Sequence, residues 1–181
     1  MKQILVTKRL TLREMTMGDL DFISSMLAHP EVMRYYPKCY TRPEAEEWIQ
    51  RQIARYGSHG HGLWLVSEKE TGEPVGQVGL APHVVDGVEE PEVGYLIHRP
   101  FWRRGMASEA AAGVRDYAFA VLDKPHVISL IRPENTPSQG VARKLGMEPV
   151  RRTNFAGLEH IVFSLARPEH TGITEGGVSD D

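Results

Sequence analysis

The sequence contains little cysteine and no cluster of metal-binding side chains. Cys39 is the single cysteine, which excludes an intrachain disulfide and a zinc site built from several cysteines. His59 and His61 stand two residues apart among glycines, without a cysteine or a third ligand at a suitable spacing. We therefore expect a flexible connection at these histidines and no bound metal.

Long apolar runs are also missing. No stretch approaches the ~20 apolar residues that a membrane-spanning helix needs. The opening segment, Met1–Thr7, lacks the apolar length of a signal peptide. We accordingly expect a cytoplasmic protein without a membrane partner.

The chain has no excess of positive charge. It carries 21 lysines and arginines against 24 aspartates and glutamates, which gives a formal net charge of −3. Part of this negative charge lies at the C-terminal end, where residues 168–181 include four acids and neither lysine nor arginine. A nucleic-acid partner is therefore not expected, because nucleic-acid-binding proteins usually present a basic surface.

Length and composition predict one globular domain and a tail. A chain of 181 residues with 41% hydrophobic residues is long enough for one sizeable core and too short for two. We place the domain at residues 1–167. The acidic remainder, residues 168–181, is polar and rich in glycine and is expected to be disordered.

Hydrophobic periodicity predicts strands and helices over most of the chain. Two helices are expected to begin with capping boxes, at Thr16–Asp19 and at Thr41–Glu44, and the second to break at the glycines of 57–62. The acidic segment 86–91 is expected to be a loop. Seven strands are predicted, at residues 9–13, 63–67, 74–80, 93–97, 127–131, 148–153 and 160–165.

One segment has the features of a phosphate site. The strand at 93–97 leads to an Arg-Arg-Gly turn at 103–105, and a helix then continues toward the strand at 127–131. A helix start presents unpaired N–H groups and the positive end of the helix dipole, and glycine permits close backbone approach. The connecting helix also predicts a right-handed crossover between two parallel strands. On its own, the Arg-Arg-Gly turn equally suits an exposed, solvated surface.

The wider sequence around this turn is more specific. The stretch 102–110, Trp-Arg-Arg-Gly-Met-Ala-Ser-Glu-Ala, resembles the pyrophosphate loop and helix start of the GNAT superfamily, whose motif is Gln/Arg-x-x-Gly-x-Gly/Ala. Residues 92–96, 135–138 and 143–147 continue the resemblance. Residues 7–13 resemble the start of the ribosomal-protein N-terminal (serine/alanine) acetyltransferase branch, so the likeness covers nearly the whole predicted domain.

This resemblance implies an α/β fold of the GNAT type. Its sheet would be mixed and mostly antiparallel, with about seven strands flanked by helices and the cofactor in a splay between the strands at 93–97 and 127–131. The implied activity is transfer of an acetyl group from acetyl-CoA to a primary amine, by direct attack in a ternary complex. The expected acceptor is a protein N-terminal α-amine or a small-molecule amine, and the expected assembly is a monomer or a homodimer. The alternative is a non-catalytic module that binds or senses acyl-CoA.

The resemblance also implies a coenzyme site. Backbone hydrogen bonds along the strand at 93–97 would hold the pantetheine, and backbone N–H groups at the helix start would hold the pyrophosphate. The first motif position is Trp102 instead of Gln or Arg, which puts the usual side-chain contact to phosphate in question. The cofactor-binding residues implied in this way are Val93, Gly94, Tyr95, Leu96, Ile97, Arg103, Arg104, Gly105, Met106, Ala107, Ser108, Asn135 and Ser138.

Three residues are expected at the reacting groups. An amine is mostly protonated at neutral pH, so a base must remove a proton before or during attack. Glu92 is the candidate base, directly or through water; the alternative role is a simple carboxylate at a strand end. By resemblance, Ser138 lies near the leaving sulfur and Asn135 at the pantetheine or the adjoining backbone, while Ala142 occupies the place of the family's frequent tyrosine. The backbone of residues 94–96 is the candidate N–H donor to the oxyanion.

Four aromatic side chains are possible lining residues of an acceptor cleft. We favour core packing for them, because aromatic side chains are usually buried. They are Tyr35, Tyr36, Trp48 and Trp64.

Two histidines and the cysteine complete the candidates. His98 and His160 are possible bases, but a structural or exposed position is the favoured interpretation, since histidine serves many other roles. Cys39 is not expected to be a nucleophile, because the family forms no acyl-enzyme and no histidine partner is indicated.

Overall fold

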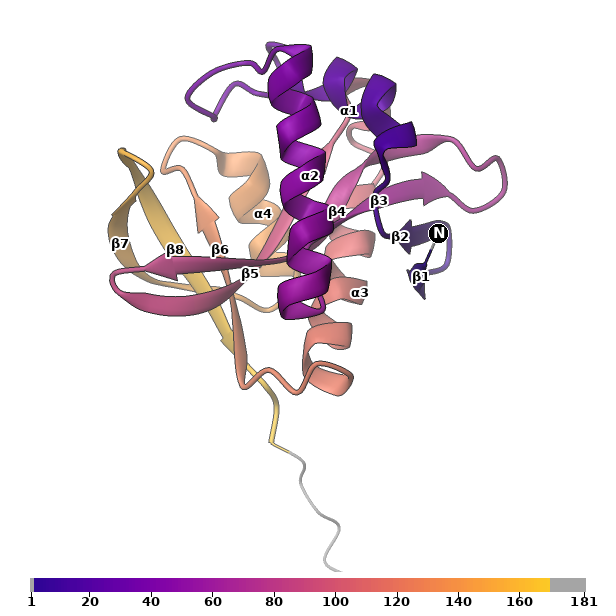
Figure 1. Cartoon of the computed structure of the whole chain (residues 1–181). Helices are drawn as coiled ribbons and strands as arrows, with labels where there is room; N and C mark the ends of the chain where they lie inside the picture. The colour runs from indigo at the N-terminus through magenta and orange to yellow at the C-terminus, as the bar shows by residue number, and fades with distance from the viewer. Residues whose placement is uncertain (1, 170–181) are drawn as a thin grey trace, which may run out of the picture.

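The computed structural model describes residues 2–169, which form a sheet with helices on both faces (Figure 1). The eight strands are β1 (Gln3–Val6), β2 (Leu10–Arg13), β3 (Leu63–Glu68), β4 (Pro74–Val85), β5 (Val88–Ile97), β6 (His126–Ile131), β7 (Glu148–Phe155) and β8 (Leu158–Ala166). The helices are α1 (Leu20–Leu27), α2 (Arg42–His59), α3 (Met106–Ala120) and α4 (Thr136–Lys144), with short 3-10 turns at Met17–Asp19 and Arg99–Phe101.

The sheet has the strand order β1-β2-β3-β4-β5-β6-β8-β7. Neighbouring strands are antiparallel except β5 and β6, which are parallel and are connected by the crossover helix α3. The predicted mixed, mostly antiparallel sheet is confirmed, with one strand more than expected. The additional strand is β1, which pairs with β2 at the edge of the sheet.

Side chains on the strands alternate between two apolar layers. On β3, Trp64 and Val66 pack in the layer that contains α3 and α4. Leu63 and Leu65, between them, pack in the layer that contains α1 and α2. Figure 1 shows α2 crossing the front of the sheet, with α3 and α4 behind it. The sheet therefore separates two helical layers, and residues of β4 and β5 reach one layer or the other in alternation.

Both predicted capping boxes form, and α2 is longer than expected. At the start of α2, the Glu44 carboxylate accepts a hydrogen bond from the Thr41 N–H at 2.8 Å. The helix then continues through Gly57 and ends at Gly60, whose φ of 75° is the left-handed conformation that glycine adopts without steric cost. The break expected at 57–62 is therefore present, but it comes later than the first glycine.

The prediction of a loop at residues 86–91 is wrong. β4 and β5 continue as an antiparallel ladder until Val85 lies opposite Val88. Asp86 and Gly87 form the turn with φ angles of 50° and 82°, and Asp-Gly is a strong signal for a two-residue hairpin turn of this kind. Glu89 and Glu90, which follow the turn, favoured a loop in the sequence-based prediction, although both are paired in the strand. As a result, β4 and β5 extend past the point where β6 joins β5.

β8 ends at Ala166, before the acidic C-terminal segment. The tail predicted at 168–181 falls mostly on residues 170–181, which lie outside the described residues. Across the described chain, no helix combines the length and the apolar character needed to span a membrane.

Candidate functional site

A gap opens in the sheet between β5 and β6. In the described chain these strands pair at Glu92 and Ile128 alone. The Glu92 carboxylate accepts a hydrogen bond from the Leu130 N–H at 3.1 Å. The Ser129 hydroxyl donates to the Val93 carbonyl at 2.8 Å. Side chains thus replace the backbone ladder here, and the predicted splay between the two parallel strands is present.

A cleft of about 1040 Å³ passes through the splay and is lined from both helical layers. One part, which we call the α3 side, is lined by Arg103, Gly105, Met106, Ala107, Ser108, Asn135 and Ser138. The other part, which we call the α2 side, is lined by residues that include Tyr36, Trp48, Arg55, Gln77, His83, Glu92 and Phe155. The gap in the sheet therefore connects the two sides.

The α3 side is built around the turn before α3. Arg103 and Gly105 have φ angles of 61° and 75°, so the chain turns sharply and leaves the N–H groups of the helix start at the cleft. The Arg104 guanidinium binds Glu68 at 2.7 Å and lies 5.5 Å from the Phe101 ring, and it does not line the cleft. Of the two predicted arginines, Arg103 is the one that lines the cleft, without a carboxylate partner among residues 2–169.

The turn is held from behind by the start of the chain. The Glu109 carboxylate, in the first turn of α3, accepts hydrogen bonds from the Thr7 hydroxyl at 2.6 Å and the Arg9 N–H at 2.7 Å. The Arg9 guanidinium also binds Glu109 at 2.6 Å and donates to the Arg104 carbonyl at 2.9 Å. Burial acts to raise the pKa of Glu109, but these hydrogen bonds outweigh it and leave the pKa below its usual value. Sequence reasoning missed this contact, because residues so far apart in the chain give no local signal.

Trp102 fixes the turn to the end of β5. Its indole N–H donates to the Ile97 carbonyl at 2.7 Å, and the Arg99 guanidinium lies 4.9 Å from the ring centre. The side chain at the first motif position is thus bonded to the protein's own backbone.

The start of α4 forms the wall of the α3 side opposite β5. The Asn135 side chain accepts a hydrogen bond from the Ser138 N–H at 3.2 Å and caps the helix. The Tyr95 hydroxyl donates to the Ser138 carbonyl at 2.8 Å, and burial together with the charge of Glu92 raises the pKa of Tyr95. Ala142 is fully buried. Sequence reasoning assigned Tyr95 a backbone role alone and missed its hydroxyl group.

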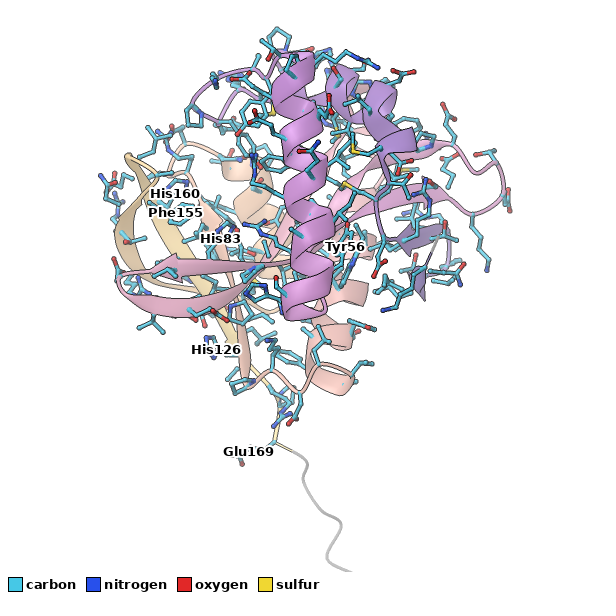
Figure 2. All side chains as sticks on the ribbon, in the orientation of Figure 1. Tyr56, His83, His126, Phe155, His160 and Glu169 are labelled. Carbon is cyan, nitrogen blue, oxygen red and sulfur yellow. The ribbon has the colours of Figure 1, made fainter. Side chains whose placement is uncertain are left out.

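The α2 side contains a carboxylate–imidazole pair. The Glu92 carboxylate lies 2.9 Å from Nε2 of His83, and its side chain is 15% exposed. The His83 ring packs edge-on against Phe155, with 5.0 Å between ring centres, and Phe155 packs in turn against His160. Figure 2 shows these three rings together between the β7–β8 hairpin and α2. Sequence reasoning missed His83, because the loop expected at 86–91 hid the hairpin that brings it beside Glu92.

The two histidines considered as bases occupy different places. His98 packs against Phe22 and His29, outside the cleft lining, and burial lowers its pKa. His160 lines the cleft, where its Nδ1 lies 2.9 Å from the Leu158 carbonyl. A structural position was thus the correct expectation for His98, whereas His160 lies at the site.

Three of the four candidate aromatic residues line the cleft: Tyr35, Tyr36 and Trp48. The preference for core packing was wrong for the two tyrosines, whereas Trp48 both lines the cleft and packs against the core of the α1–α2 layer. The Trp48 indole N–H donates to Gln77 at 2.9 Å, which holds the ring against the sheet. Trp64 follows the expectation: it is fully buried and packs edge-on against Tyr117.

Among residues 2–169, no group of three or more His, Cys, Asp or Glu side chains is arranged to hold an ion. His61 is buried, with its Nδ1 2.7 Å from the Leu80 carbonyl. Cys39 is exposed.

Residues 9–148 match the protein family described as the acetyltransferase (GNAT) domain. The chain belongs to the GNAT acetyltransferase family. It is 35% identical over 147 residues to YkkB of Bacillus subtilis (strain 168), a match that covers 81% of this chain and 86% of YkkB.

Solved structures of GNAT acetyltransferases have the same fold. An acetyltransferase from Agrobacterium tumefaciens str. C58 is 29% identical, with a TM-score of 0.79 and coverage of 92% of this chain and 95% of that one. RimL, a ribosomal L7/L12 α-N-protein acetyltransferase solved in complex with coenzyme A, has a TM-score of 0.74 at 15% identity, covering 91% and 98%. At this low identity, RimL shows the likeness of the fold alone.

Proposed function

We propose that this GNAT protein transfers an acetyl group from acetyl-CoA to a primary amine, by direct attack within a ternary complex. The observation that carries the proposal is the continuous cleft through the splay. It joins a helix start suited to phosphate on the α3 side to the Glu92 carboxylate on the α2 side. Two substrates entering from opposite faces of the sheet would therefore meet between β5 and β6.

The α3 side fits the phosphate end of acetyl-CoA. The N–H groups of Arg104, Gly105, Ala107 and Ser108 suit the pyrophosphate, as an anion at a helix start is stabilised by N–H donors and the helix dipole. Arg103 adds a cation at the cleft wall. The coenzyme A bound to RimL supports this assignment by analogy of fold.

The edge of β5 fits the extended pantetheine. Successive residues of a strand direct their backbone groups to opposite sides. The Val93 carbonyl points toward β6, because it accepts a hydrogen bond from Ser129. The backbone groups of Tyr95 therefore point into the splay as well, where no strand pairs with them in the described chain. This narrows the candidate oxyanion donor from residues 94–96 to the Tyr95 N–H.

Glu92 is suited to accept the proton of the attacking amine. The acetyl-CoA thioester supplies the acetyl group, and the amine nitrogen forms a bond to the acetyl carbon while the carbon–sulfur bond breaks. The amine proton passes to Glu92, directly or through one water, and Nε2 of His83 lies 2.9 Å from the carboxylate and orients it. The electron pair of the broken bond remains on sulfur, near the start of α4. There the Ser138 hydroxyl can donate a hydrogen bond, and Asn135 holds Ser138 in place.

Release of free coenzyme A tests the proposal directly. Purified protein is incubated with acetyl-CoA and a panel of amines, free amino acids and N-terminal peptides, and thiol release is followed beside mass spectrometry of the acceptor. Amine-dependent release with an acetylated product is the expected result. Acetyl-CoA binding without turnover on the whole panel would favour the non-catalytic acyl-CoA-sensing alternative.

A further inference from the structure

The α2 side of the cleft holds more positive charge than its own carboxylates neutralise. Three arginines line it: Arg34, Arg51 and Arg55. The two carboxylates in the lining have other partners, since Glu31 binds Arg99 at 3.0 Å and Glu92 lies beside His83. Among residues 2–169, none of the three lining arginines forms an ion pair with a carboxylate.

Of the three arginines, Arg55 is the least accessible to solvent. It is half-buried, whereas the other two are exposed and lie over the rings of Tyr35 and Trp48. Its one hydrogen bond in the described chain is a long contact of 3.4 Å to Gln52 Oε1. Burial lowers the pKa of Arg55 and the charge of Arg51 lowers it further, yet a guanidinium remains charged at any physiological pH. A partly desolvated cation without a hydrogen-bonded carboxylate is costly unless an anion binds it.

Gln52, one turn earlier on α2, fixes the cleft wall beside Arg55. The residue is fully buried in the cleft wall, and its Oε1 accepts the Leu63 N–H at 3.0 Å. Its side chain therefore ties α2 to the start of β3 and holds this part of the cleft wall in place. Arg55, on the next turn, is the group that lacks a carboxylate partner among residues 2–169.

The negative and positive groups of the α2 side occupy different positions. Glu92 lies at the splay, and Arg55 lies on α2, close enough for the charge of Glu92 to raise its pKa against the effect of burial. Aromatic side chains of Tyr36 and Trp48 line the same space. A molecule with an ammonium group at one end, a carboxylate at the other and an apolar side chain matches this arrangement.

We propose that the acetyl acceptor is a free amino acid or a close analogue, with its amine at Glu92 and its carboxylate at the Arg55 guanidinium. This inference rests on the proposed acetyltransfer and assigns the class of its second substrate. A planar carboxylate matches the planar fork of a guanidinium in a bidentate contact. Recognition of an acid at this position disfavours a peptide N-terminus, because its first carboxyl group is converted into an uncharged amide.

Pairs of acceptors that differ in the carboxylate charge test whether this charge is recognised. Amino acids with aromatic and aliphatic side chains are each compared with the corresponding carboxamide, which has nearly the same shape without the negative charge. An amide also lowers the pKa of the neighbouring amine and increases the fraction of free base, so chemistry alone favours the amide. We expect kcat/KM for the acids to be at least about tenfold higher than for the amides, which corresponds to about 1.4 kcal/mol of discrimination.

Arg55→Gln is expected to abolish this preference and to leave the dissociation constant for acetyl-CoA unchanged. Arg55→Lys is expected to keep part of the preference, because the charge remains and the planar fork is lost. Arg42→Gln, an arginine of the same helix that pairs with Asp21 outside the cleft lining, is the matched control and should retain the preference. An unchanged acid-to-amide ratio in Arg55→Gln would overturn the assignment. So would turnover of N-terminal peptides without turnover of free amino acids.

A binding measurement separates this inference from the acetyltransfer itself. Calorimetric titration of amino acids and their amides into the protein loaded with coenzyme A requires no reaction. Tighter binding of the acids, lost in Arg55→Gln, would uphold the anion site even if no acceptor were acetylated. Equal binding of acids and amides would overturn the site, even if uncharged amines were good substrates.

Discussion

The two sides of the cleft offer different kinds of group to the ligands that we propose. On the α3 side the groups at the cleft are mostly backbone N–H groups at a helix start, and several nearby side chains are bonded to the protein itself, as Arg104 is to Glu68. On the α2 side the groups at the cleft are side chains, and Arg55 has no carboxylate partner in the described chain. Backbone recognition depends on a local turn, and side-chain recognition depends on residues from several elements. Under the proposed function, substitutions on the α2 side would change the acceptor and leave binding of the acetyl donor on the α3 side unchanged.

The largest effect is expected where the two sides meet, at Glu92. Glu92→Gln preserves the shape of the side chain and its contact to Leu130, but removes the proton acceptor. We expect kcat to fall about 10²–10⁴-fold, measured as release of coenzyme A, with little change in the dissociation constant for acetyl-CoA. Glu90→Gln is a matched control: Glu90 also lies on β5 and pairs with a histidine, His126, outside the cleft lining. Equal loss of activity in both variants would assign Glu92 a structural role.

Gly105→Glu should weaken acetyl-CoA binding on the α3 side and leave the α2 side unchanged. A glutamate at a φ of 75° is strained, and its carboxylate opposes the phosphates that the turn is proposed to bind. We expect the affinity for acetyl-CoA to fall about 100-fold, equivalent to about 2.7 kcal/mol, in calorimetry. Gly72→Glu carries the same strain at a φ of 74° in the open turn between β3 and β4. Near-normal acetyl-CoA affinity of Gly105→Glu, or an equal loss in Gly72→Glu, would contradict the placement of the pyrophosphate.

Glu109→Gln tests the support behind the turn. The hydrogen bonds from Thr7 and Arg9 hold the pKa of Glu109 below its unfolded value of about 4.3. A lowered pKa stabilises the fold above that value, and the contribution disappears as the pH falls through the folded pKa. We expect the variant to lose about 1–2 kcal/mol of the free energy of unfolding at pH 7, a range reduced for the exposure of Arg9.

Urea denaturation at several pH values measures this loss. The difference between the wild type and Glu109→Gln should shrink as the pH approaches 4 and fall further below it. Glu159→Gln removes an exposed ion pair with Arg152 and is expected to change stability by less than about 0.5 kcal/mol. A difference that stays constant between pH 7 and pH 3.5 would show that the carboxylate charge of Glu109 contributes nothing.

The smallest effect is expected for Tyr95→Phe. The variant loses the hydrogen bond to the Ser138 carbonyl that ties β5 to α4, worth about 0.5–1.5 kcal/mol. Loosening of this wall should lower kcat/KM about threefold to tenfold. Tyr117 lies on α3, away from the cleft lining, and Tyr117→Phe is expected to leave kcat/KM unchanged. A loss far above tenfold would give the Tyr95 hydroxyl a direct part in the reaction.

The α3 side is the part that the sequence predicted best, because its determinants are local. The turn at 103–105 and the start of α3 each depend on residues within a few positions of one another. The cap that Asn135 forms on α4 is equally local, but from the sequence Asn135 was expected at the pantetheine or the adjoining backbone, and the cap was not predicted. Trp102 was correctly singled out as a departure from the family motif, but its bond to Ile97 required the structure.

The α2 side was predicted less well, because its contacts depend on the register of distant strands and on helix packing. His83 reaches Glu92 only because the ladder of β4 and β5 continues to the Asp86–Gly87 turn. The Asp-Gly pair was the available signal for this hairpin, and the glutamates that follow it favoured a loop instead. The role of Arg55 depends on the absence of a partner, which no local pattern reveals.

The single pairing of β5 with β6 has a mechanical consequence. The eight strands form two leaves, β1 to β5 and β6 to β8, and Glu92 and Ile128 make the one backbone pair between them in the described chain. An extended ligand that bonds to the edge of β5 would act as a strand wedged between the leaves. Bound acetyl donor would then connect the two leaves of the sheet and stabilise the folded protein. The stability of the sheet would decrease when coenzyme A leaves and increase again when acetyl-CoA binds.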